Sequence, residues 1–329
     1  MNKVSYRVVL KDDVKLTNIY TNEELMKELE AGSACKSLPD VDYRYASPVI
    51  FPKAPEERPY IYSSIALSAD GKMAFEDNKV GAFVAGKNFR DPAGASMDYW
   101  VLNVLRAYSD GMLIGANTLK NEPGIINYVK DQSLNTQRNE ILGKKEHPVN
   151  ILVSLDGTDV PWDHESFDVD PEDRFKLMIT TSPDGYEYIK ENATKKIAFL
   201  GAFKTKEEVD AAEFPAIFAD FDTYPVLVTG EGKNPDTALM LYALRKMGLE
   251  YLCAESPTYT AVLMQNGCLD EYFITYSMLY AGGKFTPGAF CPQSFCDHAH
   301  ADLVSIGIHN SNFLYTRQKL VYGLKPEQK

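Results

Sequence analysis

The alternation of short apolar stretches with amphipathic stretches, which begins near residue 60, constrains the fold of this chain more than any other feature. Apolar runs at residues 60–67, 111–115 and 251–254 have the length of strands and are bounded by turn residues. Residues 96–107 and 236–247 instead carry apolar side chains at helical spacing. Strands that alternate with helices of about ten residues predict a mostly parallel sheet that is covered on both faces.

Further segments extend this pattern to the end of the chain. A helix is expected at residues 257–266, where Gly267 ends the apolar spacing. The last two apolar segments follow each other without a helix between them, which indicates antiparallel strands. The sequence therefore predicts an α/β fold with a mostly parallel central sheet, helices on both faces and antiparallel C-terminal strands. The additional strands are expected at residues 150–155, 175–181, 226–229, 271–276, 303–308 and 313–320.

The first 57 residues do not share this alternation. Residues 21–30 are typical of a helix capped by Thr21, with Glu24 at capping-box spacing. Two proline-containing stretches without a clear period follow. A chain of 329 residues allows two domains or one enlarged domain, at roughly 150 residues per domain. We interpret residues 1–57 as an extension that packs on the main domain or on a partner subunit, and residues 58–329 as one α/β domain.

Charge and cysteine content limit the partners and the compartment. The formal net charge is −12, which argues against nucleic acid or an anionic membrane as a partner. An anionic ligand would need a local pocket of backbone N–H groups, hydroxyls or single cations. No apolar run is long enough to span a bilayer, and the N-terminus lacks the apolar segment of a signal peptide. Five cysteines, an odd number, favour free thiols and a cytoplasmic location.

Polar residues at the predicted strand ends are the candidates for chemistry, because ligands of such sheets bind beyond the carboxyl ends of the strands. The segment 255–259 offers N–H groups and hydroxyls to a phosphate, although an ordinary helix cap explains the same residues. Arg106 ends an apolar helix, where it either faces the helix dipole or binds an anionic group. Asp70, taken alone, is typical of a turn. The other candidate strand ends are residues 115–118 and Ser154.

Two thiols and two imidazoles lie close together in residues 291–300, as Cys291, Cys296, His298 and His300. Their spacing differs from that of common zinc sites, so we interpret the segment as an ordinary surface loop and expect no metal. The sequence contains no dinucleotide-binding glycine fingerprint after a strand, no phosphate loop with Gly-Lys-Ser/Thr, no nucleophile elbow and no zinc-deaminase signature.

Three groups of residues, taken in chain order, resemble a known family. The first is Arg58-Pro59-Tyr60 followed by Ser-Ala-Asp-Gly-Lys at residues 68–72. The second lies within residues 104–123, and the third is the segment 244–276, which contains Pro-Thr and later Gly-x-x-Asp-Glu. Together they resemble the pyrimidine reductases of riboflavin biosynthesis, which form the C-terminal half of a bacterial bifunctional deaminase-reductase. The matching residues of the second group are Arg106, Gly115, Thr118, Glu122 and Pro123.

The resemblance implies a dihydrofolate-reductase-like fold, NADPH as cofactor, a small-molecule substrate and a homodimer. It implies that Ala66 meets the nicotinamide, that Gly115 and Thr118 hold the cofactor phosphates, and that Ser154 lies near the adenosine ribose. The residues implied beneath the pyrophosphate are Ser256, Pro257, Thr258 and Tyr259.

The substrate side of the pattern departs from the family. Ser64 stands where the family has a lysine, and Glu255 lies one position after the family's glutamate, which moves its side chain to the opposite face of a regular strand. The family's tryptophan segment is replaced by Gly81-Ala82-Phe83, and its arginine for the ribose phosphate has no clear match. We predict that Asp70 and Glu255 serve catalysis, and that the substrate is bound by Ser64, Phe83, Arg106 and Glu122.

Three functions follow as alternatives. The first is an NADPH-dependent reductase of the pyrimidine reductase type, which transfers hydride to an imine or carbonyl carbon of a heterocycle. The second is a dihydrofolate-reductase-like enzyme with another substrate, and the third is a non-catalytic relative that keeps the fold. For the reductases, no residue of the motifs is a convincing general acid, so water could supply the proton.

Overall fold

The computed structural model describes residues 6, 10–33, 35–45, 47–122, 124–145, 147–170, 173, 175–214 and 222–324. Pro123, one of the residues that carry the resemblance, lies outside them. The strands are β1 (Thr17–Thr21), β2 (Tyr60–Ser68), β3 (Gly111–Gly115), β4 (Val149–Val153), β5 (Leu177–Thr181), β6 (Ile197–Phe203), β7 (Tyr224–Thr229), β8 (Tyr251–Ala254), β9 (Glu271–Ser277), β10 (His300–His309) and β11 (Phe313–Val321). The α-helices are α1 (Glu23–Ala31), α2 (Pro39–Arg44), α3 (Ala82–Gly86), α4 (Pro92–Tyr108), α5 (Ala116–Asn121), α6 (Gln132–Glu140), α7 (Pro183–Asn192), α8 (Lys206–Ala211), α9 (Thr237–Lys246) and α10 (Pro257–Gln265).

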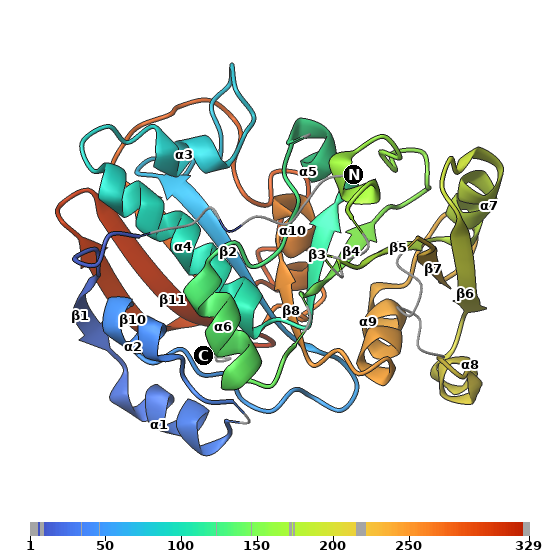
Figure 1. Ribbon diagram of the computed structural model, residues 1–329, viewed down its shortest axis with the longest axis horizontal. Coiled ribbons are helices and arrows are strands. Elements are labelled where there is room, and N and C mark those ends of the chain that lie inside the picture. The colour runs from blue at the N-terminus through green and yellow to red at the C-terminus, as the bar shows by residue number, and fades with distance from the viewer. Residues whose placement is uncertain are drawn as a thin grey trace.

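All the described strands join one sheet, in the order β1-β10-β11-β9-β2-β8-β3-β4-β5-β7-β6. The pairs from β9 to β6 are parallel, whereas β11, β10 and β1 are added antiparallel to one another and to β9. In Figure 1 the C-terminal strands therefore lie at one end of the molecule and β6 at the other. The predicted α/β architecture, mostly parallel with antiparallel C-terminal strands, is confirmed.

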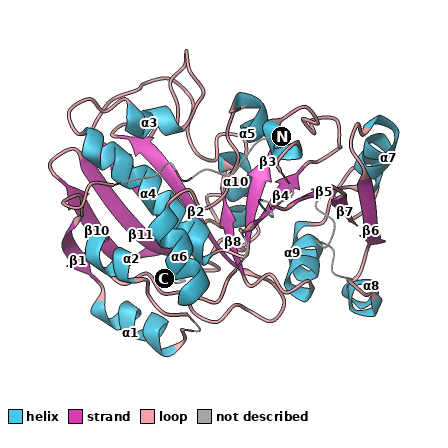
Figure 2. Cartoon of the chain, viewed as in Figure 1, coloured by secondary structure: helices cyan, strands magenta, loops and turns pink. Residues whose placement is uncertain are grey.

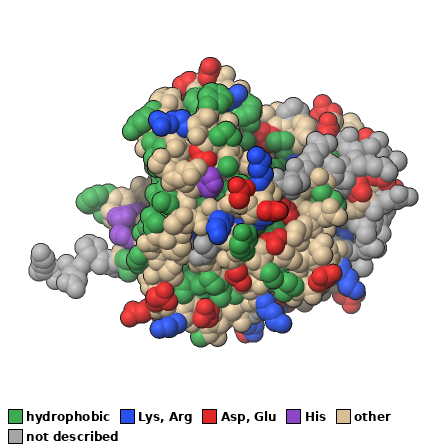
Figure 3. Space-filling model, turned by 60° about the vertical axis from the view of Figure 1, so that its left-hand side comes forward, with side chains coloured by type: hydrophobic (Ala, Val, Ile, Leu, Met, Phe, Trp, Pro, Cys, Tyr) green, Lys and Arg blue, Asp and Glu red, His purple; other side chains and the backbone are tan. Residues whose placement is uncertain are grey.

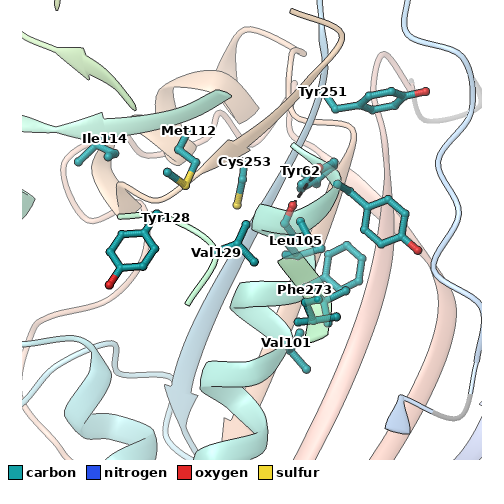
Figure 4. Packing of buried hydrophobic residues seen from close by; sticks show 14 of the residues in the cluster. Tyr62, Val101, Leu105, Met112, Ile114, Tyr128, Val129, Tyr251, Cys253 and Phe273 are labelled. Carbon is teal, nitrogen blue, oxygen red and sulfur yellow. Dashed lines mark hydrogen bonds between the residues drawn. The ribbon is translucent and has the colours of Figure 1, made fainter. Parts of the chain in front are cut away.

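Helices cover both faces of the sheet, because the central strands are apolar on both sides. On one face α4 packs on β2 and β9, and Figure 4 shows Val101 and Leu105 beside Tyr62 and Phe273. Helix α6 lies next to α4 on this face (Figure 2). The opposite face is covered by α9 and α10, with Leu241 among its fully buried side chains. Alternate residues of the central parallel strands thus belong to two separate hydrophobic cores.

Residues before Arg58 pack on the main domain and complete its sheet. Strand β1 pairs with β10, and Phe51 is fully buried with its ring stacked on Tyr62 at 4.3 Å between centroids. The buried Arg317 donates to the carbonyl of Ile50 at 2.6 Å and forms an ion pair with Glu271 at 2.6 Å. The extension therefore shares the hydrophobic core that α4 covers.

Two local expectations need correction. The first helix is capped by Asn22, whose side chain accepts a hydrogen bond from the Leu25 N–H at 3.1 Å. Thr21 does not cap it, because Thr21 still belongs to β1 and pairs with Ser305. Residues 197–203 form β6 and residues 183–192 form α7, both of which the apolar pattern failed to indicate.

In the part of the chain that the structure describes, no helix combines the length and the apolar character needed to cross a bilayer. On the face shown in Figure 3, basic side chains lie interspersed with acidic ones.

We predict that Phe51→Ala lowers the free energy of unfolding by about 3–5 kcal/mol, because it leaves a cavity in a fully packed core. Urea denaturation followed by tryptophan fluorescence would measure this loss. Tyr43→Ala is a control in the same extension, since Tyr43 is 54% exposed. A loss for Phe51→Ala no larger than that of the control would mean that the extension does not stabilise the domain.

Candidate active site

The carboxyl ends of β2, β3, β4, β5, β7 and β8 meet around one cavity of about 740 Å³. This is the edge at which ligands of parallel sheets bind, and the volume suits a small organic molecule or a cofactor. All the predicted site residues except Asp70 and Phe83 line it. They are Ser64, Ala66, Arg106, Gly115, Thr118, Glu122, Ser154, Glu255, Ser256, Pro257, Thr258 and Tyr259.

Asp70 and Phe83 lie outside the cavity lining. The Asp70 carboxylate accepts hydrogen bonds from Ser68 Oγ at 2.6 Å and from the N–H groups of Ala281 and Gly282 at 3.1 and 2.8 Å. These bonds favour the ionised carboxylate and lower the pKa of Asp70 to about 2. Asp70 thereby holds the turn after β2 against the loop after β9. Phe83 lies in α3, with the Lys87 ammonium 5.1 Å from its ring centroid, while its neighbour Ala82 lines the cavity.

Arg106 and Glu255 form a buried ion pair in the cavity wall. Arg106 donates from Nε and Nη2 to the two carboxylate oxygens of Glu255, at 2.7 and 2.6 Å. Its remaining contacts are to Asn127 Oδ1 at 3.0 Å and to the Tyr128 carbonyl at 3.1 Å. Burial opposes the charge, but Glu255 raises the pKa of Arg106 above its ordinary value. Most of the guanidinium donors are therefore occupied within the protein.

The position of Glu255 follows from strand alternation. Ala254, the last residue of β8, packs in the core beneath α9 and α10, whereas Glu255 reaches Arg106 at the end of α4. Neighbouring residues of an extended chain point to opposite faces, so the next residue is the one that meets α4.

The N-terminus of α10 faces the cavity. Ser256 is its N-cap and accepts from the Tyr259 N–H at 3.4 Å, and Thr258 follows in the first turn. A Cβ at Gly115 would lie 2.6 Å from Ser256 Oγ, so only glycine allows β3 and the start of α10 to approach this closely. Free N–H groups at a helix start, at the end of a strand, favour an anionic group such as a phosphate.

Beyond β4 and β5 the cavity is lined by hydroxyls and a carboxylate. Ser154 is buried and donates to Asp159, and it also accepts from the Gly157 N–H at 3.0 Å. Among the described residues, the hydroxyls of Thr180 and Thr181 are buried in this wall without a hydrogen-bond partner. Buried hydroxyls without a partner are costly.

Asp98 is a cavity residue that the sequence motifs did not indicate. It lies on α4 two turns before Arg106, and Leu102 lines the cavity between them. Burial raises the pKa of Asp98 to about 6, although a hydrogen bond with the Thr275 side chain acts in the opposite direction. Its helical spacing from Arg106 is a sequence signal that could have placed it on the same helix face.

The cysteine and histidine segment stays at the surface. Cys296 is exposed, and the rings of His298 and His300 lie 4.7 Å apart. Within the described ranges, no group of three or more His, Cys, Asp or Glu side chains has a geometry that could hold a metal ion.

Comparisons with known proteins define the fold class. A pyrimidine reductase-like protein from Corynebacterium diphtheriae aligns with 81% of this chain and 94% of its own, at 15% identity and a TM-score of 0.52. A deaminase/5-amino-6-(5-phosphoribosylamino)uracil reductase from Thermotoga maritima aligns at 14% identity and a TM-score of 0.50, over 81% of this chain and 58% of its own. The chain thus has the fold of pyrimidine reductase-like proteins and spans little more than half of the bifunctional one.

One curated relative also matches in sequence. It is a 2,5-diamino-6-ribosylamino-4(3H)-pyrimidinone 5′-phosphate reductase of Archaeoglobus fulgidus, 23% identical over 232 residues, which are 70% of this chain and 85% of the relative. No protein-family model matches the sequence. The resemblance to riboflavin pyrimidine reductases that the motifs carry is confirmed by these similarities.

We predict that Arg106→Met lowers the free energy of unfolding by about 3–5 kcal/mol, because it leaves the Glu255 carboxylate buried without a partner. The double variant Arg106→Met/Glu255→Gln should recover part of this loss, since it removes the uncompensated charge. Urea denaturation of the wild type and both variants would test this. Lys190→Met, which breaks an exposed pair with Glu187, is the control and should leave the midpoint almost unchanged. Equal midpoints for Arg106→Met and this control would contradict the prediction.

We also predict that Asp98→Asn stabilises the protein more at pH 8 than at pH 5. The pKa of Asp98 is raised in the folded state, so its contribution to stability is present at low pH and is lost as the pH rises through about 6. Only the pH unit between 5 and the folded pKa of about 6 contributes to this comparison, so the gain is limited to about 1.4 kcal/mol. Urea midpoints at both pH values would measure it, and a pH-independent difference between variant and wild type would refute it.

Proposed function

We propose that the protein is a nicotinamide-dependent reductase, with NADPH as the cofactor, that acts on a pyrimidine-type or related heterocycle. The observation that carries this proposal is the cavity at the carboxyl edge of the sheet, which gathers residues of the second and third motifs together with Ser64 and Ala66 of β2. The fold of the pyrimidine reductase-like proteins and the reductase name of the archaeal relative support it.

The residues of the cavity fit an elongated dinucleotide. In this proposal the start of α10, with Ser256 and Thr258, binds the pyrophosphate, and Thr118 adds a hydroxyl from α5 across the narrow approach at Gly115. The wall that contains Thr180 and Thr181 lies at the adenosine end. The nicotinamide, when bound, supplies hydride to the substrate. The protein supplies position and electrostatics around it.

In this proposal the substrate binds against the wall of the cavity formed by β2, α4 and the segment after α5, which Ser64 and Glu122 line. Burial and the charge of Glu255 both raise the pKa of Glu122. The guanidinium of Arg106 already donates hydrogen bonds to Glu255 and to the segment 127–128. We therefore assign Arg106 a structural role in this wall of the cavity. Glu255 acts through the same pair as a positioning residue. Asp70 likewise positions the loop after β9.

Cofactor binding is the first test. Titration of the protein with NADPH, followed by cofactor fluorescence, should saturate, and Thr118→Val should weaken binding about tenfold or more because a hydrogen bond to a charged phosphate is lost. Thr136→Val is the matched control, since Thr136 is exposed on α6 and bonds only within its helix. No binding at millimolar NADPH would overturn the proposal and favour a non-catalytic relative.

Turnover is the second test. The substrate named for the archaeal relative should be consumed together with NADPH. If NADPH binds and this compound is not reduced, the heterocycle is a different one. The homodimer implied by the resemblance remains a prediction, which light scattering would test.

A further inference from the structure

Asp98 lies on α4, on the face of the sheet that carries Ala66, next to which the hydride transfer is proposed. In the parallel pairing of β2 with β9, Ala66 is opposite Thr275, so their side chains share a face of the sheet. This is the face that α4 covers, because Phe273, two residues before Thr275, packs against α4. Asp98 of α4, Ser64 and Ala66 all line the same cavity, and the Thr275 side chain is near enough to Asp98 to influence its pKa.

The surroundings of Asp98 disfavour its ionised form. Among the residues that the structure describes, no Lys, Arg or His forms an ion pair with it, and burial is the largest influence on its pKa. From β11 it faces Tyr315, whose hydroxyl donates to the Gly94 carbonyl at 2.6 Å and whose pKa is raised well above its ordinary range, first by burial and then by Asp98. Thr275 of β9 is not titratable. The other titratable or cationic side chains of the lining include Lys79, Tyr99, Arg106, Glu122 and Glu255.

The ionised form of a carboxyl group is destabilised at this place, which suggests that Asp98 serves a function there. An aspartate at an exposed position of a helix is easily solvated, whereas this one lies within a cavity wall beside the buried Thr275 hydroxyl. Carboxyl groups whose pKa values approach neutrality through burial cluster at sites of proton transfer. Arg106 and Glu255 satisfy each other, and Asp70 is bound to a loop, so neither predicted acidic residue is available for this task.

We propose that Asp98 is the proton donor of the reductase, a catalytic residue that touches the substrate atom next to the carbon that receives hydride. This inference rests on the proposed reductase function. Thr275 is assigned as its positioning residue, because Thr275 lies opposite Ala66 in the sheet and its side chain acts on the Asp98 carboxyl group.

The step balances with the species already named. The substrate C=N or C=O carbon receives the hydride, and the electron pair of the double bond moves to the nitrogen or oxygen. That atom takes the proton from the Asp98 carboxyl group, which leaves Asp98 ionised. The carboxylate then regains a proton from water at the open side of the cavity, so the protein is unchanged after each turnover.

The test compares wild type, Asp98→Asn and Thr275→Val with Ser96→Ala as the control. Ser96 lies on the exposed side of α4 and its hydroxyl bonds to the Pro92 carbonyl. With saturating NADPH and the ribosylaminopyrimidinone phosphate, the wild-type kcat should fall about tenfold per pH unit above about pH 6, since the protonated acid is the active form. Asp98→Asn should lose roughly 100-fold or more at pH 6 and show no such decline, while it binds NADPH as the wild type does. Thr275→Val removes a hydrogen bond that favours the carboxylate, so its decline should begin at a higher pH.

A second readout does not require turnover. In the protein labelled with ¹³C at the aspartate carboxyl carbons, one resonance should titrate near pH 6, disappear in Asp98→Asn and shift to a higher pH in Thr275→Val. If Asp98 titrates below pH 5, or if Asp98→Asn keeps the wild-type rate and pH profile, the assignment of Asp98 is overturned while the reductase function stands. If the wild type binds no NADPH, the reductase function itself fails, and the proton-donor role fails with it.

Discussion

The ion pair between Arg106 and Glu255 is the interaction on which the candidate active site depends. It joins the end of α4 to the end of β8, a strand that lies between β2 and β3 in the sheet, and through Arg106 it also fixes the segment 127–128. These elements form adjoining parts of the cavity wall. Because both side chains are buried, neither can lose its partner without leaving an uncompensated charge, so the geometry of the wall is maintained by electrostatics as well as by packing.

A second buried ion pair joins elements on the same face of the sheet, away from the cavity. Arg317 of β11 binds Glu271 of β9, and its remaining donors hold the carbonyl groups of Pro48 and Ile50. The extension is thereby fixed under the antiparallel strands, and Phe51 is placed beside Tyr62 of β2. Strand β2 thus carries cavity residues at one end while its other end is held by the extension. The two arginines differ from phosphate-binding cations in that their donors serve the fold.

The sequence predicted the elements whose apolar runs are continuous and bounded by glycine or turn residues, which include β2, β3, β8 and α9, nearly to the residue. It failed for β6, because this strand lies at the edge of the sheet and is only partly buried, so its residues carry no clear periodicity. The cavity residues of the strand ends were predictable because parallel strands end at one edge. The Arg106–Glu255 partnership was not, since it joins side chains that are 149 positions apart. The structural role of Asp70 was not predictable either, because the N–H groups that it binds belong to a loop that is distant in sequence.

Asp98 shows what such distant pairing adds to the chemistry. The two most obvious acid–base candidates, Asp70 and Glu255, are both bound by strong donors, namely backbone N–H groups in one case and a guanidinium in the other. Donors of that strength make a carboxylate a good structural anchor and a poor acid. Asp98 meets the opposite condition, with burial and a single hydroxyl, so it can release and regain a proton near neutral pH. Glu255 and Asp70 thus stabilise the structure, and Asp98 is the carboxyl group that we assign to proton transfer.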